Sequence, residues 1–173
     1  MVKLPGLLAC LLLLSGCLGM PENAAAVRDF DLQRYLGTWY EIARLDHRFE
    51  RGLTGIQADY SLRDDGGVRV LNSGYDIASG ERKTAEGKAY FIGDPNVGRL
   101  KVSFFGPFYG AYNIIELDPD YRYAMIIGPD TDYLWILARE PQLDPAILQR
   151  LIDKAAALGA ATDELIFPAH ETT

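Results

Sequence analysis

Side chains that could carry out acid–base or nucleophilic chemistry are few in this sequence. It has two histidines, His47 and His170, and no Gly-x-Ser-x-Gly segment of the kind that presents a nucleophilic serine. A serine hydrolase needs a serine, a histidine and an acid that converge, and His170 falls close to the end of the chain in what we expect to be a mobile tail. A metal site from His47 and Asp46 is an alternative, but a lone histidine beside an acid is usually a surface residue. We therefore expect a protein without catalysis, cofactor or metal.

Both cysteines, Cys10 and Cys17, lie within the first 17 residues. The rest of the chain can therefore form neither a disulfide framework nor a thiolate metal site. Residues 1–16 have the composition of an export signal, because Lys3 precedes an apolar run from Leu7 to Leu14 that is too short to span a bilayer permanently. An ordinary secretory signal is one interpretation of this segment.

A second interpretation rests on the end of that run. Leu14-Ser15-Gly16-Cys17 resembles the bacterial lipoprotein cleavage box. The resemblance implies that Cys17 becomes the first mature residue and carries the lipid. Leu18 follows it, where the inner-membrane retention signal of such lipoproteins is usually an aspartate, so the resemblance implies an anchor in the outer membrane, facing the periplasm. We favour this interpretation, with residues 17–29 as the lipidated N-terminus and a short flexible tether.

Overall charge restricts the class of partner. The net charge is −7, which argues against nucleic acid and against general attraction to an anionic membrane surface. The apolar fraction of 49% is enough for a sizeable core, and the length of 173 residues suits one domain with an N-terminal extension. We place that domain at residues 30–168, followed by a tail at 169–173.

Short alternating runs separated by turn residues predict an all-β sandwich or barrel. Asp64-Asp65-Gly66-Gly67 and Ala78-Ser79-Gly80-Glu81 are typical hairpin turns. Eight strands are the number that closes a small antiparallel barrel with space for one ligand. The predicted strands are residues 38–45, 56–62, 68–75, 83–92, 99–105, 111–117, 123–127 and 133–139.

After the last predicted strand, the spacing between apolar residues changes from every second residue to every third or fourth residue. Asp144-Pro145 is typical of a helix start, and Gly159 of a helix end. The apolar positions between them fall on one face: Ile147, Leu148, Leu151, Ile152, Ala155 and Leu158. The outside of the barrel is the surface against which this helix would pack.

Gly37-Thr38-Trp39, then Thr131-Asp132-Tyr133, then Arg139, in that order, resembles the signature of the lipocalin family. Longer stretches are similar to the bacterial outer-membrane lipocalins: residues 34–44, 46–53, 60–66, 101–110 and 128–137. The resemblance implies an eight-stranded antiparallel up-and-down β-barrel with one C-terminal flanking α-helix, closed at one end and open at the other. It also implies binding of fatty acids, palmitate among them, or lysophospholipids, and a link to envelope stress responses.

The signature residues are expected to be structural. In the family the arginine lies across the tryptophan ring at the base of the barrel, so Gly37, Trp39 and Arg139 are predicted to form a base plug. A guanidinium over an indole contributes about 0.5–2 kcal/mol. An envelope scaffold whose barrel is filled by its own side chains, and a lipid-modifying enzyme, are the alternatives to a lipid carrier.

Ligand contacts are predicted from inward-facing positions. Resemblance favours Trp135 and Tyr109. Alternation along the strands adds seven more candidates, all aromatic or aliphatic, as an acyl chain requires: Phe104, Val102, Tyr112, Met125, Tyr90, Tyr75 and Tyr60. A shift of one residue in register would exchange the two faces.

Two features near the expected open end complete the predictions. Arg44, Arg48 and Arg51 are candidates for binding a carboxylate or phosphate headgroup, although such charges are usually a solvated rim. The turn at residues 104–109 is unusually apolar, so it would cover the opening, touch the bilayer or pack in a homodimer. The resemblance favours the homodimer.

Overall fold

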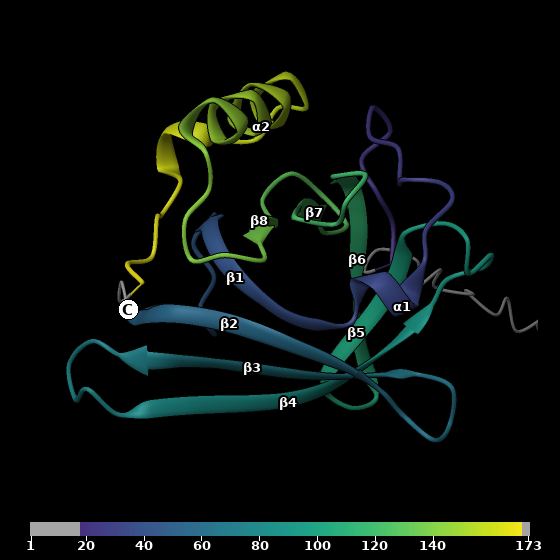
Figure 1. The fold of residues 1–173 in the computed structure, drawn as a ribbon, viewed down its shortest axis with the longest axis horizontal. Coiled ribbons are helices and arrows are strands. Elements are labelled where there is room, and N and C mark those ends of the chain that lie inside the picture. Colours follow the sequence, from purple (N-terminus) through teal and green to yellow (C-terminus); the bar gives the residue numbers. More distant parts are fainter. Residues whose placement is uncertain (1–17, 171–173) are drawn as a thin grey trace, which may run out of the picture.

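A computed structural model describes residues 18–170, which form a closed eight-stranded barrel (Figure 1). Each strand pairs antiparallel with the next, and β8 pairs with β1. The strands are β1 (Gly37–Arg44), β2 (Leu53–Leu62), β3 (Val68–Asp76), β4 (Arg82–Phe91), β5 (Arg99–Phe105), β6 (Phe108–Leu117), β7 (Tyr123–Ile127) and β8 (Leu134–Ala138). The predicted fold and strand order are confirmed.

The up-and-down order gives the barrel two different ends. The short helix α1 (Leu32–Tyr35) precedes β1 and lies at one end, with the β2–β3, β4–β5 and β6–β7 connections. We call this the closed end. The β1–β2, β3–β4, β5–β6 and β7–β8 connections lie at the other, which we call the open end.

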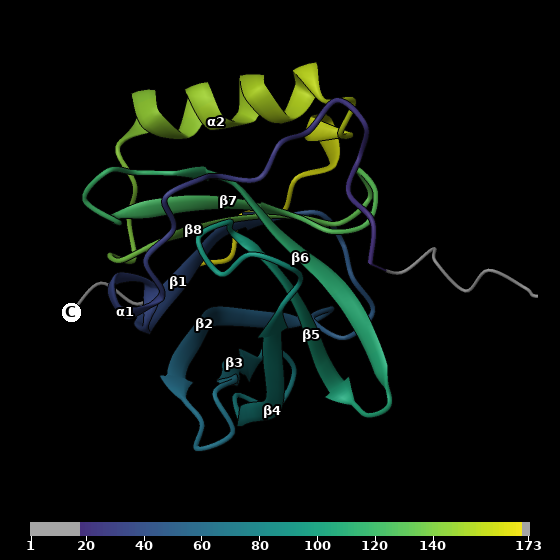
Figure 2. The same cartoon turned by 90° about the vertical axis from the view of Figure 1, so that its right-hand side faces the viewer.

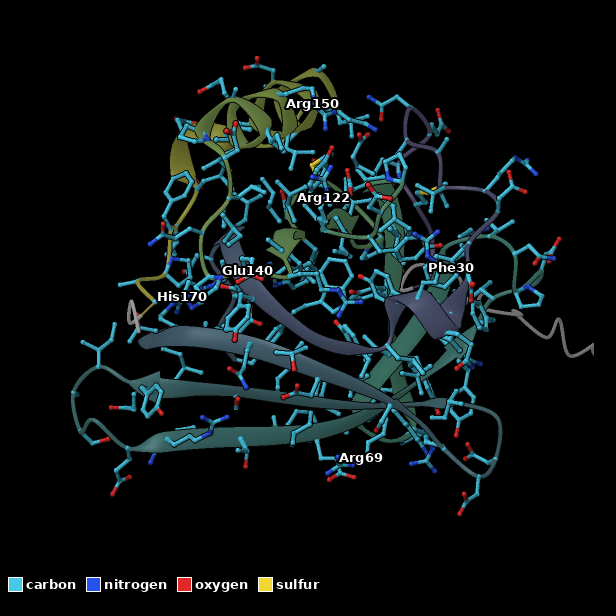
Figure 3. All side chains as sticks on the ribbon, in the orientation of Figure 1. Phe30, Arg69, Arg122, Glu140, Arg150 and His170 are labelled. Carbon is cyan, nitrogen blue, oxygen red and sulfur yellow. The ribbon has the colours of Figure 1, made fainter. Side chains whose placement is uncertain are left out.

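Helix α2 (Pro145–Ala157) lies along the outer face of β7 and β8 (Figure 2). It begins as predicted, because the Asp144 carboxylate accepts hydrogen bonds from the first free amides and Pro145 needs no such partner. Leu151 and Ala155 are fully buried against outward-facing residues of the barrel. Arg150 fixes the helix further, since it donates to the Glu116 carboxylate and the Tyr123 hydroxyl (Figure 3).

Residues 18–28 lie against the barrel and are not the flexible tether that composition predicts. The Asn113 amide donates to the Gly19 carbonyl oxygen at 3.0 Å, and Met20 packs beside the cluster under α2. Further along, the Val27 amide donates to the Ile114 carbonyl oxygen and its own carbonyl oxygen accepts from Gly98. Backbone pairing therefore holds this segment, which its Ala-rich composition does not reveal.

The C-terminal segment closes a gap between β1 and β2. These strands pair over Gly37–Tyr40 only. Beyond that point the Ile166 backbone exchanges two hydrogen bonds with Arg44, and the Ala169 carbonyl oxygen accepts from Gly55. The His170 ring nitrogen lies 2.7 Å from the Glu41 carbonyl oxygen (Figure 3). His170 is therefore held against β1, and the prediction that it lies in a mobile tail is wrong.

No helix within residues 18–170 is long and apolar enough to cross a membrane. The 3₁₀ turn η1 (Thr162–Glu164) completes the regular structure, and an isolated antiparallel bridge joins Ile166 to Arg44.

Candidate functional site in the barrel interior

The closed end is sealed by an arginine and a tryptophan. The Arg139 guanidinium carbon lies 4.0 Å from the centre of the Trp39 ring, and Trp39 is fully buried. All three Arg139 nitrogens donate to backbone carbonyl oxygens at 2.7–3.3 Å, which belong to Arg34, Leu36, Thr38 and Tyr121. These contacts form the base plug that Gly37, Trp39 and Arg139 predict.

Gly37 has two reasons to be glycine. Its φ of +93° disfavours any side chain, and an added Cβ would lie 3.4 Å from Arg139 Nη1. The other signature residues, Thr131, Asp132 and Tyr133, lie in the β7–β8 connection at the opposite end of the barrel. The signature therefore marks both ends.

Above the plug, three tyrosine hydroxyls meet inside the barrel. Tyr112 Oη lies 2.7 Å from Tyr35 Oη and 2.9 Å from Tyr60 Oη. Burial raises the pKa of Tyr60 to about 12 and the pKa values of the other two as well, so all three hydroxyls are neutral at physiological pH. This cluster is a polar floor for the interior.

Five of the nine predicted ligand-facing residues lie on the inner face. They pack in the interior cluster that includes Trp39 and Leu137: Tyr60, Val102, Phe104, Tyr112 and Trp135. Four of these remain partly exposed although they face inward, namely Val102, Phe104, Tyr112 and Trp135. Solvent therefore reaches the interior between the polar floor and the open end.

The wall formed by β3 and β4 carries small inner residues, and the Phe104 ring of the adjacent β5 fills the space over one of them, Gly87, where an added Cβ would lie 2.8 Å from the ring. Val70 faces inward, and its neighbours on the same face by alternation and register are Asn72, Ala85 and Gly87. Ala85 is exposed, so this part of the inner face opens to solvent. Gly87 and Phe104 also line a hollow of about 190 Å³ where β4 and β5 separate beyond the Lys88–Ser103 pair.

Met125 and Tyr75 are not on the inner face, so their prediction is wrong. Met125 is fully buried in the other apolar cluster, between the barrel and α2, where it lies with Leu151. An apolar helix stripe needs an apolar partner, so the outer face of β7 is as hydrophobic as the inner one. Tyr75 alternates away from Val70 and stacks on the outside with Arg82, whose guanidinium is 5.7 Å from its ring centre.

The predictions for Tyr90 and Tyr109 are also wrong, because both side chains lie on the outer face. Tyr90 is adjacent to the inward-facing Ala89, and its hydroxyl donates to the Asp65 carboxylate at 2.8 Å. The Lys101 ammonium lies over the Tyr109 ring, 4.9 Å from the ring centre, and the ring centres of Tyr109 and Tyr90 are 6.3 Å apart. The β5–β6 pairing is irregular between Val102 and Phe105, which breaks simple counting across this hairpin.

A buried charged cluster lies toward the open end. Sequence reasoning named one member, Arg44, as a headgroup candidate but missed its burial and its partners Glu41 and Glu50. Its central residue, Arg44, is 2% exposed. Strand β1 carries a bulge between Glu41 and Ala43, so Glu41 pairs with Leu137 and Arg44 pairs with Trp135, both of which face inward. The bulge therefore turns Glu41 and Arg44 to the same inner face, and Arg44 Nη1 donates to Glu41 Oε1 at 2.7 Å.

The β1–β2 connection contributes a second carboxylate to this cluster. Glu50 Oε2 accepts from Trp135 Nε1 at 3.1 Å and lies 3.9 Å from Arg44 Nε, while the Glu50 carbonyl oxygen accepts from Arg44 Nη2. Burial raises the pKa of Glu41 to about 8 and also raises the pKa of Glu50. One buried cation thus faces two carboxyl groups, of which Glu41 keeps its proton up to about pH 8.

His47 covers the cluster on the side of the open end. Its ring stacks with Phe49 and Tyr133 and lies 4.6 Å from Trp135. Burial, with the nearby Arg44 charge, lowers the pKa of His47 to about 4. The imidazole is therefore a neutral aromatic cover at physiological pH, and not a surface residue.

The other two candidate arginines behave as a solvated rim. Arg48 is exposed, and Arg51 is exposed and paired with Asp46. Arg44 alone enters the interior. A bulge has no reliable sequence signal, so alternation from Trp39 assigns Arg44 to the outer face.

Comparisons with known proteins agree with this architecture. Residues 30–170 match the model of the lipocalin-like domain. The chain is 54% identical to outer membrane lipoprotein Blc of Vibrio cholerae over 93% of its length and 95% of that protein. It is also 54% identical to outer membrane lipoprotein Blc of Escherichia coli, over 85% and 83%. Insecticyanin from the tobacco hornworm superposes with a TM-score of 0.71 at 22% identity, covering 88% of this chain and 87% of that one.

Proposed function

The chain belongs to the lipocalin family, and we propose that it is a membrane-anchored envelope protein that stores or carries a fatty acid or lysophospholipid in its barrel, without catalysis. The observation that carries the proposal is the inner face between the polar floor and the open end. There, apolar side chains such as Trp135 and Phe104 face inward yet remain partly exposed, and the wall of β3 and β4 carries small inner residues. Affinity for an acyl chain grows with the apolar area that it removes from water.

Native mass spectrometry of gently purified protein tests this function. We expect a copurified single-chain lipid, or a 1:1 adduct after addition of hexadecanoic acid. A barrel that neither carries nor accepts any lipid would support the scaffold alternative, to which the closely packed Trp39 and tyrosine region of the closed end is suited. Conversion of added lysophospholipid into products would support the enzyme.

We also propose attachment to the outer membrane, facing the periplasm, through lipid on Cys17. Cys17 lies outside the residues that the structure describes, and the support comes from its sequence context and from the names of the two bacterial relatives. The Leu18 carbonyl oxygen lies 3.4 Å from Arg99 Nη2, so an anchor on the preceding residue would keep the barrel close to the bilayer. Cys17→Ser should abolish palmitate labelling and release the protein from the outer-membrane fraction. Unchanged fractionation would contradict the anchor.

The β5–β6 hairpin is proposed as a homodimer contact. Phe105 and Phe108 are 79% and 78% exposed, and adjacent exposed aromatic side chains of this size commonly mark interfaces. We expect the double variant Phe105→Ser/Phe108→Ser to shift the protein from dimer to monomer in light scattering. A wild-type monomer over micromolar concentrations would remove this proposal.

A further inference from the structure

We propose that Arg44 binds the carboxylate of a fatty acid inside the barrel, and that Glu50 occupies this position until the ligand arrives. This inference rests on the proposed lipid-binding function and names the ligand class within it. Three observations support it: an incompletely satisfied guanidinium, a carboxylate that can leave, and a match of charge.

The first observation is the state of Arg44. Its Nε is buried and has no hydrogen-bond partner within residues 18–170, since Glu50 Oε2 stays 3.9 Å away. A buried donor without an acceptor costs free energy that a closer acceptor would recover. Glu41 already holds Nη1 on the other edge of the guanidinium. The edge that carries Nε and Nη2 is therefore the one on which a ligand carboxylate would gain contacts.

The second observation concerns what fills that edge. Glu50 comes from the β1–β2 connection and not from the barrel wall, and the residues on both sides of it, Phe49 and Arg51, are exposed. Its carboxylate approaches Arg44 Nε and accepts from Trp135 Nε1. A ligand carboxylate placed there would receive both donors. The Glu50 backbone is fixed, because its carbonyl oxygen accepts from Arg44 Nη2 and from the Leu53 amide, so the exchange requires only that the Glu50 side chain rotate away from Arg44.

The third observation is charge. Exchange of one carboxylate for another leaves the buried site with the same number of charges, so a monoanionic fatty acid adds no uncompensated charge to the interior. A zwitterionic lysophospholipid would bring an additional ammonium beside a buried arginine. The acyl chain of a fatty acid held at Arg44 would run past Trp135 toward Phe104 and the small residues of β3 and β4, which are the partly exposed part of the inner face.

Calorimetric titrations of the full chain with hexadecanoic acid and with hexadecan-1-ol test the site. The two probes have unbranched saturated hydrocarbon chains of the same length, so the alcohol measures the barrel and the ratio of affinities measures the headgroup site. We expect the acid to bind at least about tenfold more tightly than the alcohol, as hydrogen bonds to a charged partner commonly provide. Arg44→Gln should abolish this preference, because the acid then loses its charged partner while the alcohol has none to lose. Arg48→Gln, an exposed arginine near the same turn, is the matched control and should change neither affinity.

Glu50→Gln keeps the shape of the competing side chain and removes its charge. It should tighten acid binding several-fold. If Arg44→Gln does not fold, this variant still tests whether Glu50 competes with the ligand carboxylate for Arg44. Equal acid and alcohol affinities in the wild type, or unchanged acid affinity in Glu50→Gln, would overturn the site. Lysophosphatidylcholine affinity that falls in Arg44→Gln while acid affinity stays constant would also overturn it. Failure of every probe, the alcohol included, would instead reject the lipid-binding function itself.

Discussion

Each end of the barrel holds an arginine beside a tryptophan, but the two pairs are built differently. At the closed end, Arg139 lies over Trp39 and donates to four backbone carbonyl oxygens. Toward the open end, Arg44 lies near Trp135, donates to one side chain, Glu41, and to one backbone carbonyl oxygen, that of Glu50, and has the Glu50 carboxyl group 3.9 Å from its Nε. Backbone acceptors cannot leave without unfolding, whereas side-chain acceptors can be exchanged.

This difference separates a structural arginine from one suited to binding. The Arg139 site is complete, so any change there removes contacts that nothing replaces. The Arg44 site has an unused Nε donor and a neighbour from an exposed turn. Stability should therefore respond most strongly to changes at the closed end, and pH and ligand to changes at the open end.

The largest expected effect tests the closed end. Arg139→Ala should lower the free energy of unfolding by about 2–4 kcal/mol, because it removes hydrogen bonds to four carbonyl oxygens, most of them partly buried, and uncovers Trp39. Denaturant unfolding measures this loss, and ligand affinity should be largely kept in the protein that remains folded. Arg51→Ala, at an exposed ion pair, is the control and should change stability by less than about 1 kcal/mol. A similar small loss in both variants would remove the structural distinction between the two ends.

Next in size is the pH response of Glu41. Its pKa in the folded protein is about 8, above the usual 4.5, so unfolding releases a proton between these values. Stability from this group is fully present below pH 4.5 and is lost as pH rises through 8, by at most about 1.4 kcal/mol per pH unit. Glu41→Gln should flatten that decline in melting temperatures measured from pH 5 to 8. An unaltered slope would contradict a buried, protonated Glu41.

His47 should give a smaller effect of opposite sign. Its folded pKa is about 4, below the usual 6.5, so unfolding takes up a proton between these values and stability falls as the solution becomes more acidic. His47→Asn should reduce this acid-side loss between pH 6.5 and 4, as followed by thermal melts. The exposed Arg48→Gln variant serves as the control and should keep the wild-type profile.

The smallest stability effect is expected at the polar floor. Tyr112→Phe removes a hydroxyl that joins Tyr35 and Tyr60, and should cost about 1 kcal/mol. Because this floor lies between the two arginine sites, the variant should leave both the pH profile and the acid-over-alcohol preference as they are. A loss of that preference would place the ligand headgroup at the floor and not at Arg44.

Turn residues and an apolar helix stripe predicted the barrel and the flanking helix, because both are local patterns, and resemblance to the lipocalin signature implied the base plug. The sequence predicted less well which side chains face the interior of the barrel. Tyr60 and Trp135 were assigned to the correct face, but Tyr109 and Met125 were not, because irregular pairing and the helix-covered outer wall make inner and outer faces look alike. Arg44 was one of three candidate headgroup arginines, but its burial and inward orientation could not be predicted, since the bulge at Glu41–Ala43 that turns it inward leaves no trace in composition or spacing.

The most direct test of the account is a fluorescence titration with hexadecanoic acid, because the two tryptophans lie in the two regions compared. Trp39 is fully buried beneath Arg139, whereas Trp135 lies on the partly exposed inner face beside Arg44. We predict a saturable 1:1 change in emission that disappears in Trp135→Phe. Absence of any saturable change, or a change that persists in Trp135→Phe, would contradict a lipid site in the interior near the open end.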